Sequence, residues 1–320
     1  MKKIERYETF VPLYLTNTCD SQCKMCNMRV QNHSLHRIVP NKEKILEQLD
    51  IILNIERISA VCILTGEYTG EKKRIENLDL VIWCIKQALQ KGFQKVFFNI
   101  GSLYDNEIDI LDKSFPDKKN IVLSLFQETY DKECYERYFG KCDSNNPKSD
   151  YERRITTPMR FLERGFEQVD VGVLLGLNSV ETEVTLLMEH VDKLSKYAKQ
   201  IYISLPRICG VRNLKDVVTD NEYYSAVKRV YEECKDIKII ATTREDRNML
   251  LRLLPYVKVI SPGCSDVLPY TTSGKIKNNL ETSQFQVKPL RDRPSEVLEG
   301  LPVRNAIKYY HSAESRTNNN

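Results

Sequence analysis

The chain has 320 residues, 41% of them hydrophobic, with 48 basic and 44 acidic side chains and a formal net charge of +4. The length fits one large domain with a sizeable core, and the nearly balanced charge argues against a dedicated nucleic-acid surface. No apolar run reaches the roughly 18 residues of a membrane span, and residues 1–6 lead into no apolar core of a signal peptide. We therefore expect a cytoplasmic protein that binds neither nucleic acid nor membranes, with its ten cysteines in a reducing compartment.

Hydrophobic periodicity predicts eight strands, each but the last followed by at least one helix. The predicted strands span residues 11–15, 58–64, 95–100, 121–126, 168–175, 200–205, 237–242 and 257–260. The predicted helices span residues 41–54, 75–91, 106–112, 130–138, 157–164, 181–197, 221–234 and 245–253. Alternating strands and helices imply a parallel sheet, so the sequence predicts an α/β fold, a complete (β/α)8 TIM-type barrel over residues 1–261. Residues 262–320 are expected to form a C-terminal appendage that caps one end of the barrel.

Three cysteines follow the first predicted strand in a loop over residues 17–27. Cys19, Cys23 and Cys26 have the spacing C-x3-C-x2-C, and such a loop can wrap one corner of an iron–sulfur cube. Cubane clusters usually take four thiolates, so three leave one iron open for a small-molecule ligand. The alternatives are three ordinary buried cysteines or a zinc site, but zinc ribbons pair one C-x2-C knuckle with a second, which this sequence lacks. The other seven cysteines are scattered singly, so we expect one cluster and no auxiliary one.

Polar residues follow several other predicted strands, where barrel enzymes place their working groups. Thr65-Gly66-Glu67 follows the second strand, Glu128 the fourth, Arg207 the sixth and Arg244 the seventh. We expect these side chains to converge with the cysteine loop on one mouth of the barrel. Buried charges are costly alone, so such groups need each other or a charged ligand.

Each of these charged residues also has an ordinary interpretation. Glu128 can accept two donors from a ligand or can simply carry a charge at a helix N-terminus. Arg244 can grip a carboxylate with both arms of its guanidinium or can pair with an acid at residues 245–246. Arg207 can equally form an ion pair at the rim, and Glu67 can be a surface acid in a loop.

The cysteine loop resembles that of the radical S-adenosylmethionine (SAM) superfamily, whose open iron chelates the amino and carboxylate groups of SAM. Thr65-Gly66-Glu67 resembles the Gly-Gly-Glu motif of the same superfamily, with only the second glycine present. Further blocks are similar to 2-iminoacetate synthase, the tyrosine lyase of thiamine biosynthesis, to the tyrosine lyase that matures the di-iron hydrogenase cofactor and, more loosely, to biotin synthase. These blocks lie at residues 126–130, 148–158, 172–177, 203–207, 242–245, 284–287 and 293–297.

This resemblance implies a 4Fe–4S cluster on Cys19, Cys23 and Cys26 and SAM as the second cofactor. It implies reductive cleavage of SAM to a 5′-deoxyadenosyl radical, which takes hydrogen from an aromatic amino acid, tyrosine or tryptophan, before its Cα–Cβ bond breaks. Cofactor binding would then fall to Thr65, Glu67, Glu128 and Arg154, with Arg154 on the carboxylate of SAM. The catalytic residues would be Arg244, on the substrate carboxylate, and Glu128. A flavodoxin- or ferredoxin-type protein would supply the electron.

Two departures leave the substrate open. Met25 stands where the family often has an aromatic residue, and the segment after Gly263 does not match the family's Asn-Pro-Gly-Gly segment. The alternative is a radical SAM enzyme of biotin-synthase-like or mutase type, acting on a non-aromatic substrate in cofactor or natural-product biosynthesis. A non-catalytic iron–sulfur or SAM-binding module is a third hypothesis, which formation of 5′-deoxyadenosine after anaerobic reduction would exclude.

Overall fold

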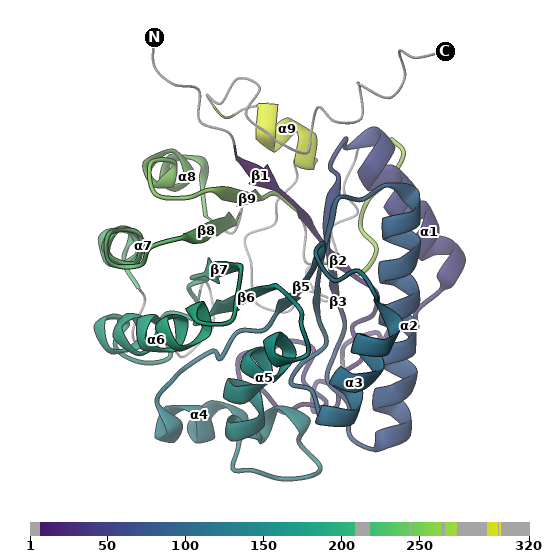
Figure 1. Ribbon diagram of the computed structural model, residues 1–320, viewed down its shortest axis with the longest axis horizontal. Helices are drawn as coiled ribbons and strands as arrows, with labels where there is room; N and C mark the ends of the chain where they lie inside the picture. Colours follow the sequence, from purple (N-terminus) through teal and green to yellow (C-terminus); the bar gives the residue numbers. More distant parts are fainter. Residues whose placement is uncertain are drawn as a thin grey trace.

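The computed structural model describes residues 7–208, 218–242, 245–263, 266–273, 293–299 and 301. Its strands are β1 (Glu8–Thr9), β2 (Val11–Tyr14), β3 (Ala60–Leu64), β4 (Lys95–Asn99), β5 (Ile121–Ser124), β6 (Gln168–Gly172), β7 (Gln200–Ser204), β8 (Ile237–Thr242) and β9 (Val259–Ser261). Its α-helices are α1 (Lys42–Asp50), α2 (Glu71–Lys91), α3 (Asp105–Ser114), α4 (Lys132–Phe139), α5 (Tyr151–Glu163), α6 (Val180–Ser195), α7 (Asp220–Glu233), α8 (Arg247–Leu253) and α9 (Pro294–Glu299). Figure 1 shows the strands between α1–α3 on one side and α6–α8 on the other.

The strands form one parallel sheet in the order β1-β9-β8-β7-β6-β5-β4-β3-β2. β1 pairs with β9, and β2 pairs with β3. Only Phe10 separates β1 from β2, so the two short strands are one N-terminal strand that joins both ends of the sheet. The predicted eight-stranded barrel is therefore confirmed, with its first strand divided in two.

The interior of the barrel is filled with side chains rather than open. Its apolar layer consists of Phe10, Ala60, Cys62, Phe97, Val122, Tyr202, Ile240 and Val259. At the end where the strands begin, Glu8 accepts hydrogen bonds from Tyr202 (3.0 Å) and Lys238 (2.5 Å), and Lys95 lies 3.6 Å from its carboxylate. This packed end leaves the carboxyl ends of the strands as the place for chemistry.

The largest difference from the predicted elements is the start of α5. The sequence predicts this helix only over residues 157–164. Residues 151–156 are mostly polar and show no apolar periodicity, and a proline such as Pro158 is typical of a first helical turn. The helix begins at Tyr151 instead, because the side chain of Asp150 accepts a hydrogen bond from the backbone N–H of Arg153 at 2.9 Å. The first predicted helix also changes character, since α1 continues as a π-helix at Ile51–Ile55.

The described part of the C-terminal appendage packs against the first helical segment. Gln48 in α1 exchanges two hydrogen bonds with the backbone of Tyr270, at 2.7 and 2.9 Å. Glu56, after the π-helix, accepts from the backbone N–H and hydroxyl of Ser295 at 3.0 and 2.9 Å. The domain boundary at residue 261 stays a prediction. Within the described ranges, no helix has both the length and the apolar character needed to cross a membrane.

Candidate cofactor and active site

The cysteine loop leaves the carboxyl end of β2 and is largely buried. Cys23 is 5% exposed and Cys26 9%, while Cys19 is half-buried. The Sγ atom of Cys19 accepts hydrogen bonds from the backbone N–H groups of Ser21 and Glu67, both at 3.4 Å. One cavity is lined by all three cysteines together with Thr65, Gly66, Glu67, Asn99, Glu128, Phe139, Lys148 and Arg154. Of the side chains predicted to converge with the cysteine loop, Thr65, Glu67 and Glu128 line this cavity, and Arg207 does not.

The three thiols suit a cluster better than a single metal ion. Burial raises the pKa of Cys19, Cys23 and Cys26, to about 12 for Cys26, so without a positive partner they stay protonated near neutral pH. Iron would supply that partner, because metal ligation deprotonates a thiol. Among the described residues, no three His, Cys, Asp or Glu side chains gather around one metal-ion position. A cubane does not need them to, because each thiolate binds a different iron.

Arg37 organises the cysteine loop, although nothing in the sequence marks it. Its guanidinium donates to the backbone carbonyls of Asn17 (2.7 Å), Met28 (2.8 Å) and Arg29 (2.8 Å). The side chain of Asn17 in turn accepts from the N–H of Ile38 at 2.7 Å. The loop thus curls around one half-buried cation, which fixes the backbone on both sides of the thiols.

Steric crowding explains why Thr65-Gly66-Glu67 has a glycine at its centre. A Cβ atom at Gly66 would lie 2.1 Å from the carbonyl oxygen of Thr18 and 2.8 Å from the Cβ of Cys19. Only glycine lets the end of β3 approach the cysteine loop this closely. The N–H of Asp20 then donates to the carbonyl of Glu67 at 2.9 Å, so the two segments are joined directly.

Two acids and two bases meet in the same cavity. Arg154 Nη1 donates to Glu67 Oε1 at 2.9 Å, its Nε donates to the carbonyl of Phe126 at 2.7 Å, and its Nη2 lies 3.5 Å from Glu128 Oε1. Lys148 Nζ donates to the same Glu128 oxygen at 2.6 Å. Burial alone would raise the pKa of Glu67, but Arg154 and then Lys148 outweigh it and lower that pKa. The four side chains therefore form a charge-balanced network, which is the condition for burying them.

Glu128 carries the clearest signs of a ligand-binding group. Its backbone has φ of 72°, a left-handed conformation that non-glycine residues seldom adopt and that is enriched at functional sites. Its second carboxylate oxygen, Oε2, is buried and has no hydrogen-bond partner within the described part of the chain. The amide of the preceding Gln127, which the sequence reasoning passed over, is buried with neither of its polar atoms paired to a described group. Such unmet groups are costly, and a bound ligand would satisfy them.

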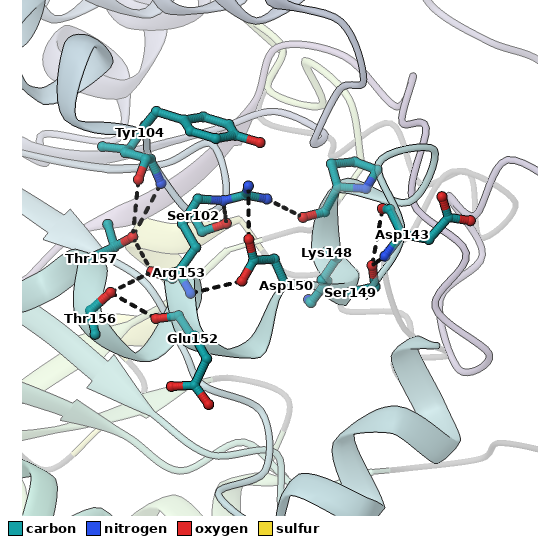
Figure 2. A network of polar contacts seen from close by, with 12 residues as sticks. Ser102, Tyr104, Asp143, Lys148, Ser149, Asp150, Glu152, Arg153, Thr156 and Thr157 are labelled. Atoms are coloured by element: carbon teal, nitrogen blue, oxygen red, sulfur yellow. Dashed lines mark hydrogen bonds and ion pairs between the residues drawn. The ribbon is translucent and has the colours of Figure 1, made fainter. Parts of the chain in front are cut away.

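The start of α5 is held by a polar network around Arg153 (Figure 2). Arg153 donates to the hydroxyl of Ser102 at 3.0 Å and the carbonyl of Pro147 at 2.8 Å, and lies 3.1 Å from the carboxylate of Asp150. This network fixes the chain on both sides of Lys148 and Arg154. Lys148 is a further site residue to which the sequence reasoning gave no role, because buried and exposed lysines look alike in a sequence.

Two of the predicted site residues, Arg207 and Arg244, are not among the described residues that line this cavity. Arg207 is engaged at the rim, where it pairs with Glu245 through two hydrogen bonds and with Asp220 at 2.7 Å. Its ordinary interpretation as a rim ion pair is therefore the one found. Arg244 lies outside the described residues, so its catalytic role stays a prediction.

The structure thus has a (β/α)8 barrel with a buried three-cysteine site and a charged network at its carboxyl-end mouth. No family model matches the sequence. Curated relatives are the 2-iminoacetate synthases of Escherichia coli (strain K12), 24% identical over 302 residues, and of Salmonella typhimurium (strain LT2), 23% identical over 210 residues. The first alignment covers 90% of this chain and 73% of the relative, and the second covers 62% and 50%.

Solved structures agree with this fold. The FeFe-hydrogenase maturase HydG from Carboxydothermus hydrogenoformans superposes with a TM-score of 0.76 at 23% identity, covering 92% of this chain and 65% of HydG. Methylornithine synthase (PylB) superposes with a TM-score of 0.63 at 15% identity, covering 85% of this chain and 76% of PylB. The chain therefore spans a little under two thirds of that HydG. The barrel and the resemblance to 2-iminoacetate synthase are both confirmed.

Proposed function

We propose that this chain is a radical SAM lyase that acts on an aromatic amino acid. The observation that carries the proposal is the single cavity in which three buried thiols meet two acids and two bases. Cys19, Cys23 and Cys26 hold one 4Fe–4S cluster, and SAM binds beside it. Bound together, a reduced cluster and SAM supply a 5′-deoxyadenosyl radical.

The charged network matches the main chain of SAM. SAM carries an ammonium group and a carboxylate on one carbon, which are the opposites of Glu67 and Arg154. Opening the 2.9 Å pair between these two residues gives each a partner of opposite charge on the ligand. The exchange leaves no buried charge alone, which satisfies the condition for burying them.

Glu128 and its neighbour supply the remaining polar contacts. Glu128 Oε2 has no partner among the described residues and can accept a hydrogen bond from a ribose hydroxyl or an amino group. The Gln127 amide offers both a donor and an acceptor beside it. Thr65, whose hydroxyl accepts from Asn77 at 3.0 Å, lines the same cavity.

Tyrosine is the substrate that the resemblance favours, and Cα–Cβ cleavage is the reaction. The support is the similarity to 2-iminoacetate synthase along 90% of the chain. Arg244, which follows β8 in the sequence, would anchor the substrate carboxylate with a two-armed contact that lysine cannot reproduce. The electron comes from a flavodoxin- or ferredoxin-type donor.

The test is a substrate survey with anaerobically reconstituted protein. The protein is incubated with SAM, reductant and each amino acid in turn, and products are identified by mass. Tyrosine should give 5′-deoxyadenosine together with fragments of the side chain and of the two-carbon remainder. Reaction with a non-aromatic substrate instead would support the alternative, a radical SAM enzyme of biotin-synthase-like or mutase type. If protein that holds its cluster forms no 5′-deoxyadenosine with any substrate, the proposed enzymatic activity is refuted.

A further inference from the structure

Lys148 is a buried cation in the cluster cavity to which the proposed function gives no role. It lies in the short 3₁₀ turn Pro147–Ser149 just before α5 and is 7% exposed. Its ammonium donates to Glu128 Oε1 at 2.6 Å and lies 5.1 Å from the centre of the Phe139 ring. The same side chain lines the cavity together with Cys23 and Cys26. A lysine is seldom buried so completely unless it is paired, as Lys148 is with Glu128.

The surrounding chain ties Lys148 to the cysteine loop. The hydroxyl of Tyr135 donates to the backbone carbonyl of Lys148. The side chain of Asn146, two residues earlier, donates to the carbonyl of Phe139 at 2.5 Å and accepts from the N–H of Gln22 at 3.2 Å. Gln22 is the residue before Cys23, so these contacts fix the cation relative to the thiols, and Figure 2 shows the adjoining network around Arg153.

The charge of Lys148 persists in this buried setting. Burial and the nearby Arg154 would lower the pKa of Lys148, but opposing groups, led by the carboxylate of Glu128 and including Glu67, outweigh them and raise it. Arg154, the other cation that lines the cavity, is 2.9 Å from Glu67 and is expected to turn to the carboxylate of SAM. Lys148 is thus the cation that stays with the cysteines.

Lys148 acts on the thiols electrostatically. Its side chain lines the same cavity as Cys23 and Cys26, which are only 5% and 9% exposed. Solvent screens charges much less between buried groups than at the surface. The positive charge of Lys148 therefore acts on whatever the two cysteines hold.

We infer that Lys148 raises the reduction potential of the cluster held by Cys19, Cys23 and Cys26, and so makes it easier to reduce. This inference rests on the proposed function. Reduction adds one electron from an external low-potential donor to the cluster and makes it more negative. A fixed positive charge in a water-poor cavity stabilises that more negative state, and local charge is among the features that set iron–sulfur potentials.

The test is a redox titration of the reconstituted, SAM-free protein, followed by the electron paramagnetic resonance signal of the reduced cluster. Lys148→Gln removes the charge but keeps a hydrogen-bond donor for Glu128, and Lys148→Arg keeps the charge. Lys132→Gln is the matched control, because Lys132 in α4 is an exposed lysine also paired with a glutamate, Glu152, at 2.9 Å. We expect Lys148→Gln to lower the equilibrium constant for reduction about tenfold, which is ~59 mV for one electron, and the other two variants to stay near the parent.

Each outcome separates this inference from the proposed function. A parent protein that holds no cluster refutes the proposed function. A cluster whose potential is the same in the parent and in Lys148→Gln refutes only the role of Lys148, and weaker SAM binding in that variant would then show that the lysine merely positions Glu128. If Lys148→Gln folds but holds no iron, Lys148 serves cluster assembly and the inference is also wrong.

Discussion

Replacing Gly66 by alanine tests the contact between the end of β3 and the cysteine loop. The added methyl would lie 2.1 Å from the carbonyl oxygen of Thr18 and 2.8 Å from the Cβ of Cys19. Ordinary contacts of a Cβ atom begin near 3.4 Å, so the overlap with the Thr18 oxygen exceeds 1 Å. Both obstructing atoms belong to the backbone or sit directly on it, so no side-chain rotation relieves the clash.

The loop itself must therefore move. Overpacking of this kind typically costs about 1–3 kcal/mol, and here the displacement falls on Cys19 and on the N–H of Glu67 that donates to its sulfur. We expect Gly66→Ala to fold, to lose much of its iron after anaerobic reconstitution and to cleave SAM slowly. Iron analysis, visible absorption and 5′-deoxyadenosine formation measure the three effects.

Gly165→Ala is the control for a general loss of stability. Gly165 closes α5 with φ of 82° and has no atom within 4 Å of an added Cβ. Alanine there costs roughly 1–2 kcal/mol of left-handed strain but lies away from the cluster cavity. It should lower the melting temperature and leave the iron content unchanged. Full iron content and parental SAM cleavage in Gly66→Ala would show that the assigned close approach is wrong.

Three further predictions concern the charged residues. Glu67→Gln and Arg154→Met should each weaken SAM binding by about one to two decades, the value of ~1.5–3 kcal/mol for a lost charged hydrogen bond, with the cluster intact; unchanged affinity in titrations of both variants would contradict the assignment. Arg244→Lys should keep SAM binding but cleave its amino acid far more slowly than it forms 5′-deoxyadenosine, and parental turnover would remove the carboxylate role. Asp170 in β6 accepts from Ser124 at 2.6 Å and Ser204 at 3.0 Å, and burial raises its pKa from 3.8 to about 7. Because the native state then holds a proton that the unfolded chain has lost, the free energy of unfolding should fall by up to about 4 kcal/mol as pH rises from 4 to 7. Denaturant unfolding of the cluster-free Asp170→Asn variant should lack this fall, and a persisting fall would exclude Asp170 as its source.

The barrel was predictable because its strands are buried on both faces. Runs such as Ile121–Ser124 are continuously apolar or small, and each is separated from the next by a helix with one apolar face. The convergence of the polar residues that follow the strands was predictable from the parallel arrangement, because parallel strands bring their carboxyl ends to one edge of the sheet. Cys19, Glu67 and Glu128 therefore came together as expected.

The residues that the sequence did not reveal act through tertiary contacts. Arg37 binds backbone carbonyls, and any arginine in a loop has the same local signature. Lys148 is buried only because the Asn146 side chain and Tyr135 fold its turn inward. The start of α5 depended on a single cap, Asp150, in a polar stretch without periodicity. The sequence alone could not decide between a ligand-binding role and a rim ion pair for Arg207, because its partner Glu245 lies 38 residues away in the chain.

The central claim is that one cavity holds one cluster and SAM, and iron analysis with SAM cleavage tests it most directly. Anaerobically reconstituted protein should contain about four irons per chain, as one 4Fe–4S cluster requires, and should release 5′-deoxyadenosine when reduced with SAM. The Cys19/Cys23/Cys26→Ala triple variant should lose both the iron and the product. About eight irons in the parent, or iron and 5′-deoxyadenosine retained by the triple variant, would contradict the account.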